Sequence, residues 1–199
     1  MFQLIETIRI QNGNPVNLTQ HQTRMDRSIF ELFKTKNNIQ LQNIIEVPNE
    51  AQQGIWKCRI IYNIEIHEIS YTPYIYRNIK SLQIIEASNI EYPYKYSDRN
   101  EFETLLYKKQ DADEILITKN GYITDTSYTN IIFFDGTQWV TPKTYLLPGT
   151  QRAFLLQNNK IQEKSIHKND ILKFKKARMI NCFLDLEYGN DIAIDQIYS

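Results

Sequence analysis

Alternation of apolar and polar residues along much of this chain constrains its fold more than any other sequence feature. The pattern has the period of a β-strand in residues 55–70 and 81–87, and both stretches are rich in β-branched residues. Residues 2–10 alternate in the same way and end at Asn12-Gly13, a dipeptide typical of tight hairpins. We therefore expect the first half of the chain to form an antiparallel meander.

Further strand pairs are expected after residue 110. Residues 114–126 alternate on both sides of Asn120-Gly121, and residues 129–142 do so around Asp135-Gly136. Near the C-terminus, three more alternating runs predict strands: residues 160–166, 177–186 and 191–197.

Helical spacing is confined to a few segments. A stripe that includes Met25 and Ile29 predicts a helix from about Leu18, with Thr19 as its N-cap. Asp98 is expected to cap a second helix that runs to about Lys109. Two further helices are expected after a turn in residues 147–158 and, as a short one, in residues 168–174. The chain is therefore predicted to be mixed α/β (α+β).

Turn residues and a proline in the segment 88–94, SNIEYPY, suggest a boundary between two domains. We predict a small N-terminal α/β domain in residues 1–87, a linker in residues 88–94 and a larger C-terminal domain in residues 95–199. A chain of 199 residues is long enough to bury a core in each.

Composition narrows the possible partners. The 23 basic and 23 acidic residues balance, so no nucleic-acid partner is expected. No stretch approaches the roughly 20 apolar residues of a membrane span, and no membrane partner is expected. Cys58 and Cys182 lie far apart in apolar runs and are interpreted as reduced thiols of a cytoplasmic protein. None of the three histidines is spaced with a cysteine as metal ligands are, so no metal is expected.

Five short motifs follow one another in an informative order: His21-x-x-Arg24, Lys95, Asp125 with TSYTN, Thr141-Pro142, and LPGTQR at residues 147–152. Asp125 lies 30 residues after Lys95. This order resembles the class IV aminotransferase family, the fold-type IV enzymes that use pyridoxal 5'-phosphate (PLP). The family includes branched-chain and D-amino-acid aminotransferases and aminodeoxychorismate lyase.

The resemblance implies roles for individual residues. Lys95 would form a Schiff base (an internal aldimine) with PLP, for which its amine must lose a proton. Asp125 would keep the pyridine nitrogen protonated, although family members usually have a glutamate there. Arg24 would bind the phosphate, together with backbone N–H groups at Gly149, Thr150 and Gln151.

Three further expectations depend on the same resemblance. Asn181, in a stretch that looks like that of the lyase-type members, would also contact the cofactor. Arg59, on an alternating strand, is a candidate for binding a substrate carboxylate, or else is a surface charge. The chain lacks the first hairpin of full-length members, so its N-terminal domain is expected to be shortened.

Three functions fit these expectations. The first is a PLP-dependent lyase like 4-amino-4-deoxychorismate lyase, which acts on a small-molecule amino substrate and releases pyruvate and an aromatic amine. The second is an amino-acid aminotransferase of the branched-chain or D-amino-acid type. The third is a non-catalytic binding protein with the PLP-enzyme fold. The resemblance also implies a homodimer.

Overall fold

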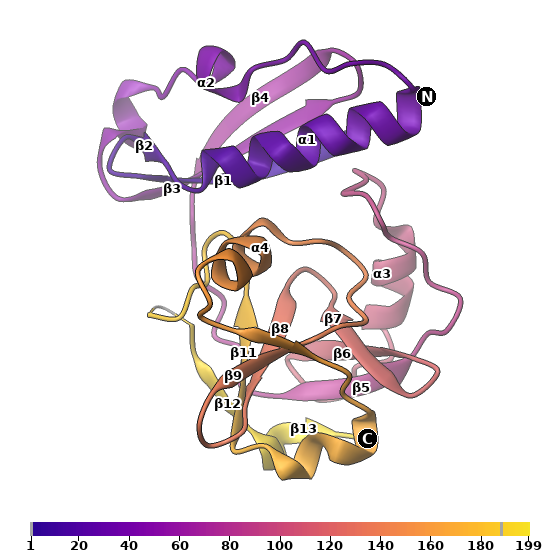
Figure 1. The fold of residues 1–199 in the computed structure, drawn as a ribbon. Coiled ribbons are helices and arrows are strands. Elements are labelled where there is room, and N and C mark those ends of the chain that lie inside the picture. Colours follow the sequence, from indigo (N-terminus) through magenta and orange to yellow (C-terminus); the bar gives the residue numbers. More distant parts are fainter. Residues whose placement is uncertain (1, 188) are drawn as a thin grey trace. The chain divides into compact units, whose positions relative to one another are not determined.

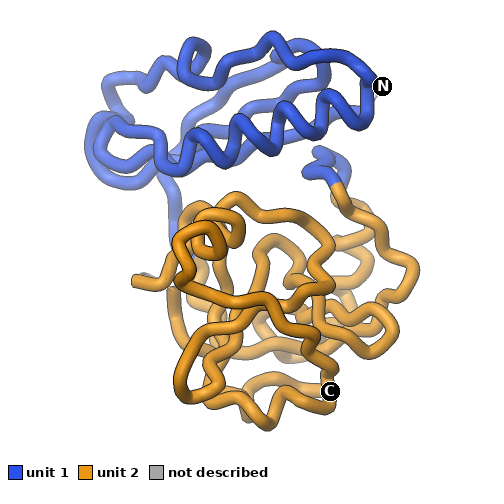
Figure 2. The backbone as a smooth tube through the Cα atoms, viewed as in Figure 1, with its two compact units in different colours: residues 1–76, 94–98 blue, residues 77–93, 99–199 orange. Residues whose placement is uncertain are grey.

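The structure, a computed structural model, describes residues 2–187 and 189–199. The backbone divides into two compact units, shown in different colours in Figure 2. Unit 1 comprises Met1–Tyr76 and Tyr94–Asp98, and unit 2 comprises Arg77–Pro93 and Arg99–Ser199. The prediction of a mixed α/β fold is confirmed.

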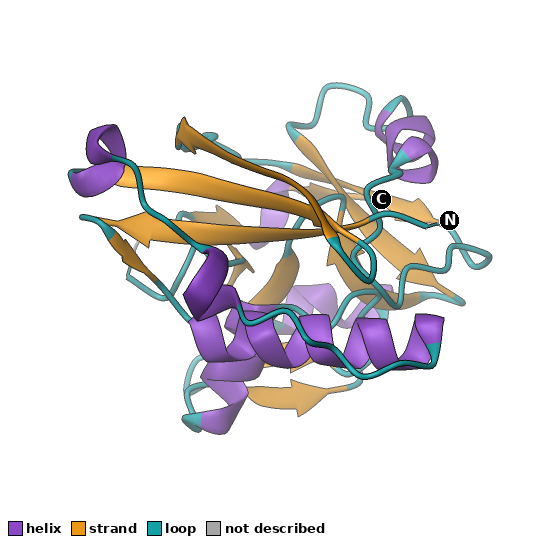
Figure 3. Cartoon of the chain, turned by 90° about the horizontal axis from the view of Figure 1, so that it is seen from above, coloured by secondary structure: helices purple, strands orange, loops and turns teal. Residues whose placement is uncertain are grey.

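Unit 1 is a four-stranded antiparallel sheet, in the order β2-β1-β3-β4, with one long helix (Figures 1 and 3). Its elements are β1 (Leu4–Gln11), β2 (Asn14–Pro15), α1 (Leu18–Phe33), α2 (Leu41–Ile44), a 3₁₀ turn η1 (Asn49–Gln52), β3 (Ile55–Tyr62) and β4 (Ile66–Pro73). The hairpin at Asn12-Gly13 is confirmed, and Gly13 has the positive φ of 79° that favours glycine.

Side chains alternate between the two faces of the sheet, and this determines which strand residues pack against α1. Cys58, Ile60 and Tyr62 of β3 are buried with Met25 and Ile29 of α1 in one apolar cluster. The residues between them on β3 point to the opposite face of the sheet, because side chains of a strand alternate. The helical stripe of the sequence is thus the surface by which α1 covers the sheet.

The segment 94–98 extends the same sheet beyond β1. The amide of Ile5 donates to the carbonyl of Lys95 at 2.9 Å, and the amide of Ser97 donates to the carbonyl of Gln3 at 2.9 Å. An antiparallel bridge pairs Leu4 with Tyr96 between these two bonds. Lys95 therefore lies at the edge of β1, within unit 1.

Unit 2 contains two sheets. The four-stranded sheet has the order β13-β5-β6-β7 and the five-stranded sheet the order β10-β9-β8-β11-β12. The elements of unit 2 are β5 (Leu82–Glu86), α3 (Asn100–Leu106), β6 (Glu114–Lys119), β7 (Tyr122–Thr126), β8 (Asn130–Phe134), β9 (Trp139–Pro142), α4 (Thr150–Gln157), β10 (Gln162–Lys164), η2 (Lys168–Lys173), β11 (Lys176–Ile180), β12 (Asp191–Ala193), η3 (Ile194–Gln196) and β13 (Ile197–Tyr198).

Both sheets of unit 2 contribute to one core. Leu116 of β6 and Ile123 of β7 are buried in the same cluster as Phe133 of β8 and Met179 of β11. Ile132, on the other face of β8, packs with Leu155 of α4 in a second cluster. This arrangement fixes α4 against the five-stranded sheet, just after the loop that follows β9.

Two predicted helix caps are wrong. The N-cap of α1 is Asn17, which has a left-handed backbone conformation. Thr19, the predicted cap, already lies inside the helix. The N-cap of α3 is Arg99, one residue after the predicted Asp98, and the helix ends at Leu106. Neither Asn17 nor Arg99 accepts a capping hydrogen bond through its side chain.

The late strands are also shorter than predicted. β11 ends at Ile180, because Asn181 and Leu184 exchange backbone hydrogen bonds in a turn. Residues 191–197 do not form one strand: β12 and β13 belong to different sheets, with η3 between them.

The chain passes from one compact unit to the other at positions that differ from the predicted boundaries at 87/88 and 94/95. The reason is that β5 pairs with β6 of unit 2, and residues 94–98 pair with β1 of unit 1.

Candidate functional site

The most deeply buried charged cluster of unit 1 joins β1 to α1. The guanidinium of Arg24 donates to both oxygens of Glu6, from Nε to Oε1 at 2.8 Å and from Nη2 to Oε2 at 2.6 Å. Nδ1 of His21 lies 2.6 Å from Oε2 of the same carboxylate. His21 and Arg24 reach Glu6 together because they lie three residues apart and so share one face of α1.

Burial by itself would raise the pKa of Glu6. The positive charge of Arg24 and the hydrogen bonds from His21 and Arg24 outweigh it and lower this pKa to about 2. Burial lowers the pKa of His21. The hydrogen bond and the charge of Glu6 oppose this shift, and the positive charges of Arg24 and Lys95 add to it, so that the pKa is lowered overall. We therefore treat Glu6 as ionised and His21 as neutral, with its Nδ1–H donating to Glu6. Arg24 and Lys95 thus influence the same buried histidine.

Aromatic contacts hold the segment that carries Lys95. The hydroxyl of Tyr94 donates to Glu31 of α1 at 2.9 Å, and the guanidinium of Arg27 lies 5.6 Å from the centre of the Tyr94 ring. The rings of Tyr94 and Tyr96 meet edge to face, with their centres 5.9 Å apart. The backbone on both sides of Lys95 is therefore fixed in unit 1.

In unit 2, Asp125 lies at the end of β7 and is almost fully buried. Its Oδ2 accepts from the backbone amides of Leu146 and Leu147, at 3.0 and 2.9 Å. Its Oδ1 accepts from Nδ2 of Asn130 at 2.8 Å. Since a carboxylate has about four acceptor positions, Oδ1 can still accept one more donor.

Desolvation dominates the ionisation of Asp125. Burial raises its pKa to about 6, although the amides of Leu147 and Leu146, the side chain of Asn130 and the charge of Arg152 all oppose that rise. A cationic donor placed beside Oδ1 would lower this pKa again and stabilise the ionised carboxylate. The site is therefore suited to a partner such as a protonated ring nitrogen.

A glycine is required beside this carboxyl group, because the backbone at residue 149 lies very close to the side chain of Asn130. Gly149 is the N-cap of α4, and a Cβ added there would lie 1.9 Å from Oδ1 of Asn130. Thr150 and Gln151, the first residues of α4, are buried. The first N–H groups of a helix have no acceptor inside the helix, and the dipole there favours an anion. The predicted Gly149, Thr150 and Gln151 thus lie together, next to the Asn130 that binds Asp125.

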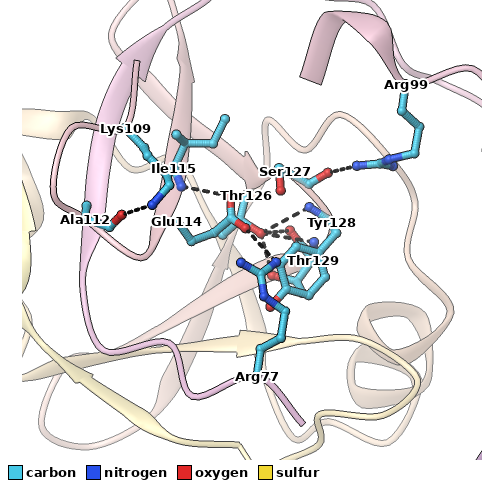
Figure 4. A network of polar contacts seen from close by, with 10 residues as sticks. All are labelled: Arg77, Arg99, Lys109, Ala112, Glu114, Ile115, Thr126, Ser127, Tyr128 and Thr129. Carbon is cyan, nitrogen blue, oxygen red and sulfur yellow. Dashed lines mark hydrogen bonds and ion pairs between the residues drawn. The ribbon is translucent and has the colours of Figure 1, made fainter. Parts of the chain in front are cut away.

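A turn directly after Asp125, the 126–129 loop, is held by two arginines (Figure 4). Arg99 donates from Nη2 to the carbonyl oxygen of Ser127. Arg77 stacks on the ring of Tyr128, 5.0 Å from its centre, and contacts the fully buried Glu114 at 3.4 Å. Within the loop, the hydroxyls of Thr126 and Thr129 are 2.8 Å apart. The loop that follows Asp125 is therefore rigidly anchored in unit 2.

The two remaining predicted residues have simpler surroundings. Oδ1 of Asn181 accepts from the amides of Phe183 and Leu184, at 2.8 and 3.0 Å, so this oxygen caps a turn and only the amide nitrogen is suited to an anion. Arg59 lies on the face of the unit 1 sheet opposite to α1, with Thr7 and Ser70 as its neighbours in register. Lys57 points to the same face.

The structure thus groups the predicted residues within each unit. Arg24 and Lys95 belong to unit 1, and Asp125, Gly149, Thr150 and Gln151 belong to unit 2. The sequence prediction missed two residues. Glu6 could have been found as a lone carboxylate at an inward position of an apolar strand. Arg99 gave no such signal, because its hydrogen-bond partner Ser127 lies 28 residues later.

Within residues 2–187 and 189–199, no group of three or more His, Cys, Asp and Glu side chains is arranged to hold a metal ion. Over the same residues, no helix has the length and hydropathy needed to cross a membrane.

Comparison with known proteins identifies the family. The sequence profile of the amino-transferase class IV family matches residues 3–186, and the chain belongs to this family. Its fold is that of the fold-type IV PLP enzymes, in a shortened form, and its similarity to relatives covers nearly the whole chain. The predicted family and fold are confirmed.

Three relatives illustrate the similarity. An uncharacterised protein of Haemophilus influenzae is 41% identical over 184 residues, which cover 91% of this chain and 97% of that protein. A crystal structure from Haemophilus somnus, of a protein provisionally named 4-amino-4-deoxychorismate lyase, is 34% identical with a TM-score of 0.88 and covers 94% of this chain and 98% of the other. The PLP-bound structure of a hypothetical aminotransferase from Mycobacterium tuberculosis is 14% identical, with a TM-score of 0.76. The match covers 96% of this chain and 80% of the other, and it shows the fold alone.

The class IV family is PLP-dependent, and the residues of this chain fit the cofactor in their chemistry. Asp125 offers a buried carboxyl group with an acceptor position for a ring nitrogen. Gly149 leaves the space that a Cβ would fill, at a helix N-terminus suited to a phosphate. Arg24 supplies a fixed positive charge and Lys95 an amine.

Proposed function

We propose that this protein is a PLP-dependent enzyme that acts on a small-molecule amino substrate, with a lyase reaction like that of 4-amino-4-deoxychorismate lyase. The observation that carries the proposal is the buried carboxyl group of Asp125, held by three donors beside the glycine that begins α4. The similarity over 94% of the chain to the Haemophilus somnus protein supports the choice of reaction.

Lys95 is the proposed catalytic residue. Nζ of Lys95 would hold the cofactor at its aldehyde carbon. When the substrate amine takes that place, the freed Lys95 would act as the base that removes the proton from the carbon bearing the amine. Bound PLP supplies a ring that withdraws electrons from this carbon. Asp125 would accept a hydrogen bond from the protonated ring nitrogen and so would sustain that withdrawal.

Arg24 and the N-terminus of α4 are proposed to bind the phosphate. Nε and Nη2 of Arg24 pair with Glu6, and the guanidinium would place a positive charge beside the phosphate. The backbone amides at Gly149, Thr150 and Gln151 supply further donors, and the amide nitrogen of Asn181 is proposed as another.

Arg59 is proposed to bind a carboxylate of the substrate. Lys57 points to the same sheet face and adds a second positive charge. We expect Arg59→Met to raise KM for an anionic substrate while leaving the affinity for PLP unchanged. The proposal also includes a homodimer in the cytoplasm, and analytical ultracentrifugation of the purified protein tests the dimer.

Pyruvate release tests the reaction. The holoprotein is supplied with 4-amino-4-deoxychorismate, and pyruvate is measured with a coupled dehydrogenase. The proposal predicts pyruvate and an aromatic amine in equal amounts, and none with Lys95→Ala.

An amino-acid aminotransferase is the second candidate, which the family itself favours. Alanine or glutamate is then supplied with a keto acid, and exchange of the amino group is measured. Exchange without pyruvate release from aminodeoxychorismate would establish the aminotransferase. If the protein binds PLP but catalyses neither reaction, it would be a non-catalytic binding protein.

A further inference from the structure

We propose that Arg99 is a positioning residue for Lys95, because it fixes the unit 2 residues that flank segment 94–98. The inference rests on the function proposed above for Lys95, and it concerns contacts that lie within unit 2. It goes beyond that function because it names the residue that fixes both ends of the segment.

The chain enters unit 1 after Pro93 and returns to unit 2 at Arg99, so residues 94–98 form a short excursion that carries Lys95. The unit 2 residues that flank the excursion contact each other. The guanidinium of Arg99 lies 5.9 Å from the centre of the Tyr92 ring and 4.7 Å from that of Phe102. Both rings are buried and meet edge to face, 4.8 Å apart. The base of the excursion thus contains two rings in contact with each other and one cation close to both.

The same guanidinium donates to the carbonyl oxygen of Ser127, as Figure 4 shows. Ser127 is buried and lies two residues after Asp125, in the loop whose following residue Asn130 binds that carboxyl group. A planar guanidinium can stack on rings and donate in its own plane at once, which an ammonium group cannot do. Within unit 2, Arg99 therefore holds the residues that flank segment 94–98 against the 126–129 loop.

A charge-preserving substitution isolates this role. Arg99→Lys keeps the positive charge and loses the combination of stacking and in-plane donation. Arg77→Lys is the matched control, because Arg77 holds the same loop through a different contact, with its guanidinium 5.0 Å from the centre of the Tyr128 ring. Thermal unfolding of both variants verifies that each is folded.

Two measurements test the inference. Amide hydrogen exchange on the protein without cofactor should be about tenfold faster over residues 94–98 in Arg99→Lys than in Arg77→Lys. The rate at which added PLP develops its visible absorption band should fall by a similar factor in Arg99→Lys alone.

Unchanged exchange over residues 94–98 in Arg99→Lys would overturn the inference. Faster exchange with an unchanged rate of band formation would also overturn it, because the segment would then be anchored without positioning Lys95. If wild-type protein gives no band at all, the proposed function of Lys95 fails, and the exchange result separates that failure from the anchoring of the segment.

Discussion

Arg24 and Glu6 form a buried two-point ion pair, with Nε to Oε1 at 2.8 Å and Nη2 to Oε2 at 2.6 Å. The pair locks α1 to β1 and fixes the plane of the guanidinium. A fixed plane matters because an arginine that binds a phosphate must present two parallel N–H groups in the right direction.

Removing the charge of Glu6 should therefore destabilise the protein. Glu6→Gln leaves the buried Arg24 without a compensating charge, and we expect the free energy of unfolding to fall by roughly 3–5 kcal/mol. Urea denaturation measures the change. Asp170→Asn is the control, since Asp170 pairs with Lys173 at 2.6 Å with both side chains exposed, and its loss should cost much less. Equal losses in the two variants would contradict the role given to Glu6.

Asp125 should make the stability of the protein without cofactor depend on pH. Its pKa rises from the ordinary 3.8 to about 6 in the folded state, so folding takes up a proton between these values. The free energy of unfolding should fall by about 3 kcal/mol as pH rises from 3.8 to 6, and then level off.

Denaturation of wild-type protein and of Asp125→Asn across this range provides the measurement, and the fall should be absent from the variant. Glu6 acts in the opposite direction and at lower pH, because its pKa is lowered from 4.5 to about 2 and its contribution is lost as pH falls through that range. A fall of the same size in Asp125→Asn would mean that another group takes up the proton.

Gly149, at the start of α4, should matter for cofactor binding because it has no side chain that would clash with Asn130. Gly149 has a φ of −70°, which alanine adopts easily, so Gly149→Ala acts only through the clash of its Cβ with Asn130. We expect the affinity for PLP to fall by about tenfold, as for the loss of one good contact. Gly54→Ala is the control: nothing lies within 4 Å of the added Cβ, and its cost comes from a φ of +77°. Equal affinities in the two variants would contradict the close approach at α4.

Arg24 should contribute affinity for the cofactor without changing its bound form. Arg24→Lys keeps a positive charge but cannot make the two-point contact with Glu6, so we expect weaker retention of PLP during dialysis. The absorption band of the PLP that remains should keep its wavelength. A shifted band would place Arg24 near the reacting atoms instead of the phosphate.

The sequence predicted the local elements of the fold well where side-chain chemistry decides them. The hairpin turns at Asn12-Gly13 and Asn120-Gly121 were found because few residue pairs adopt their backbone angles. The helix α1 was found because its apolar stripe meets the sheet. The N-cap Asn17 was missed because it adopts a left-handed conformation and its side chain makes no capping bond.

Long-range pairing was not predictable in the same way. Residues 94–98 pair with β1, which lies 90 residues earlier, and no local pattern indicates that contact. The same limit applies to Arg99, whose partner Ser127 lies 28 residues later. Glu6 was missed because a single polar residue in an apolar strand gives no hint of which partners will neutralise it.

Reductive trapping tests the central claim most directly. The purified protein is incubated with PLP, reduced with borohydride and digested, and the modified lysine is identified by mass spectrometry. We predict one cofactor per chain on Lys95, and no modification of Lys95→Ala. A label distributed over other lysines, or equal labelling of Lys95→Ala, would contradict the account.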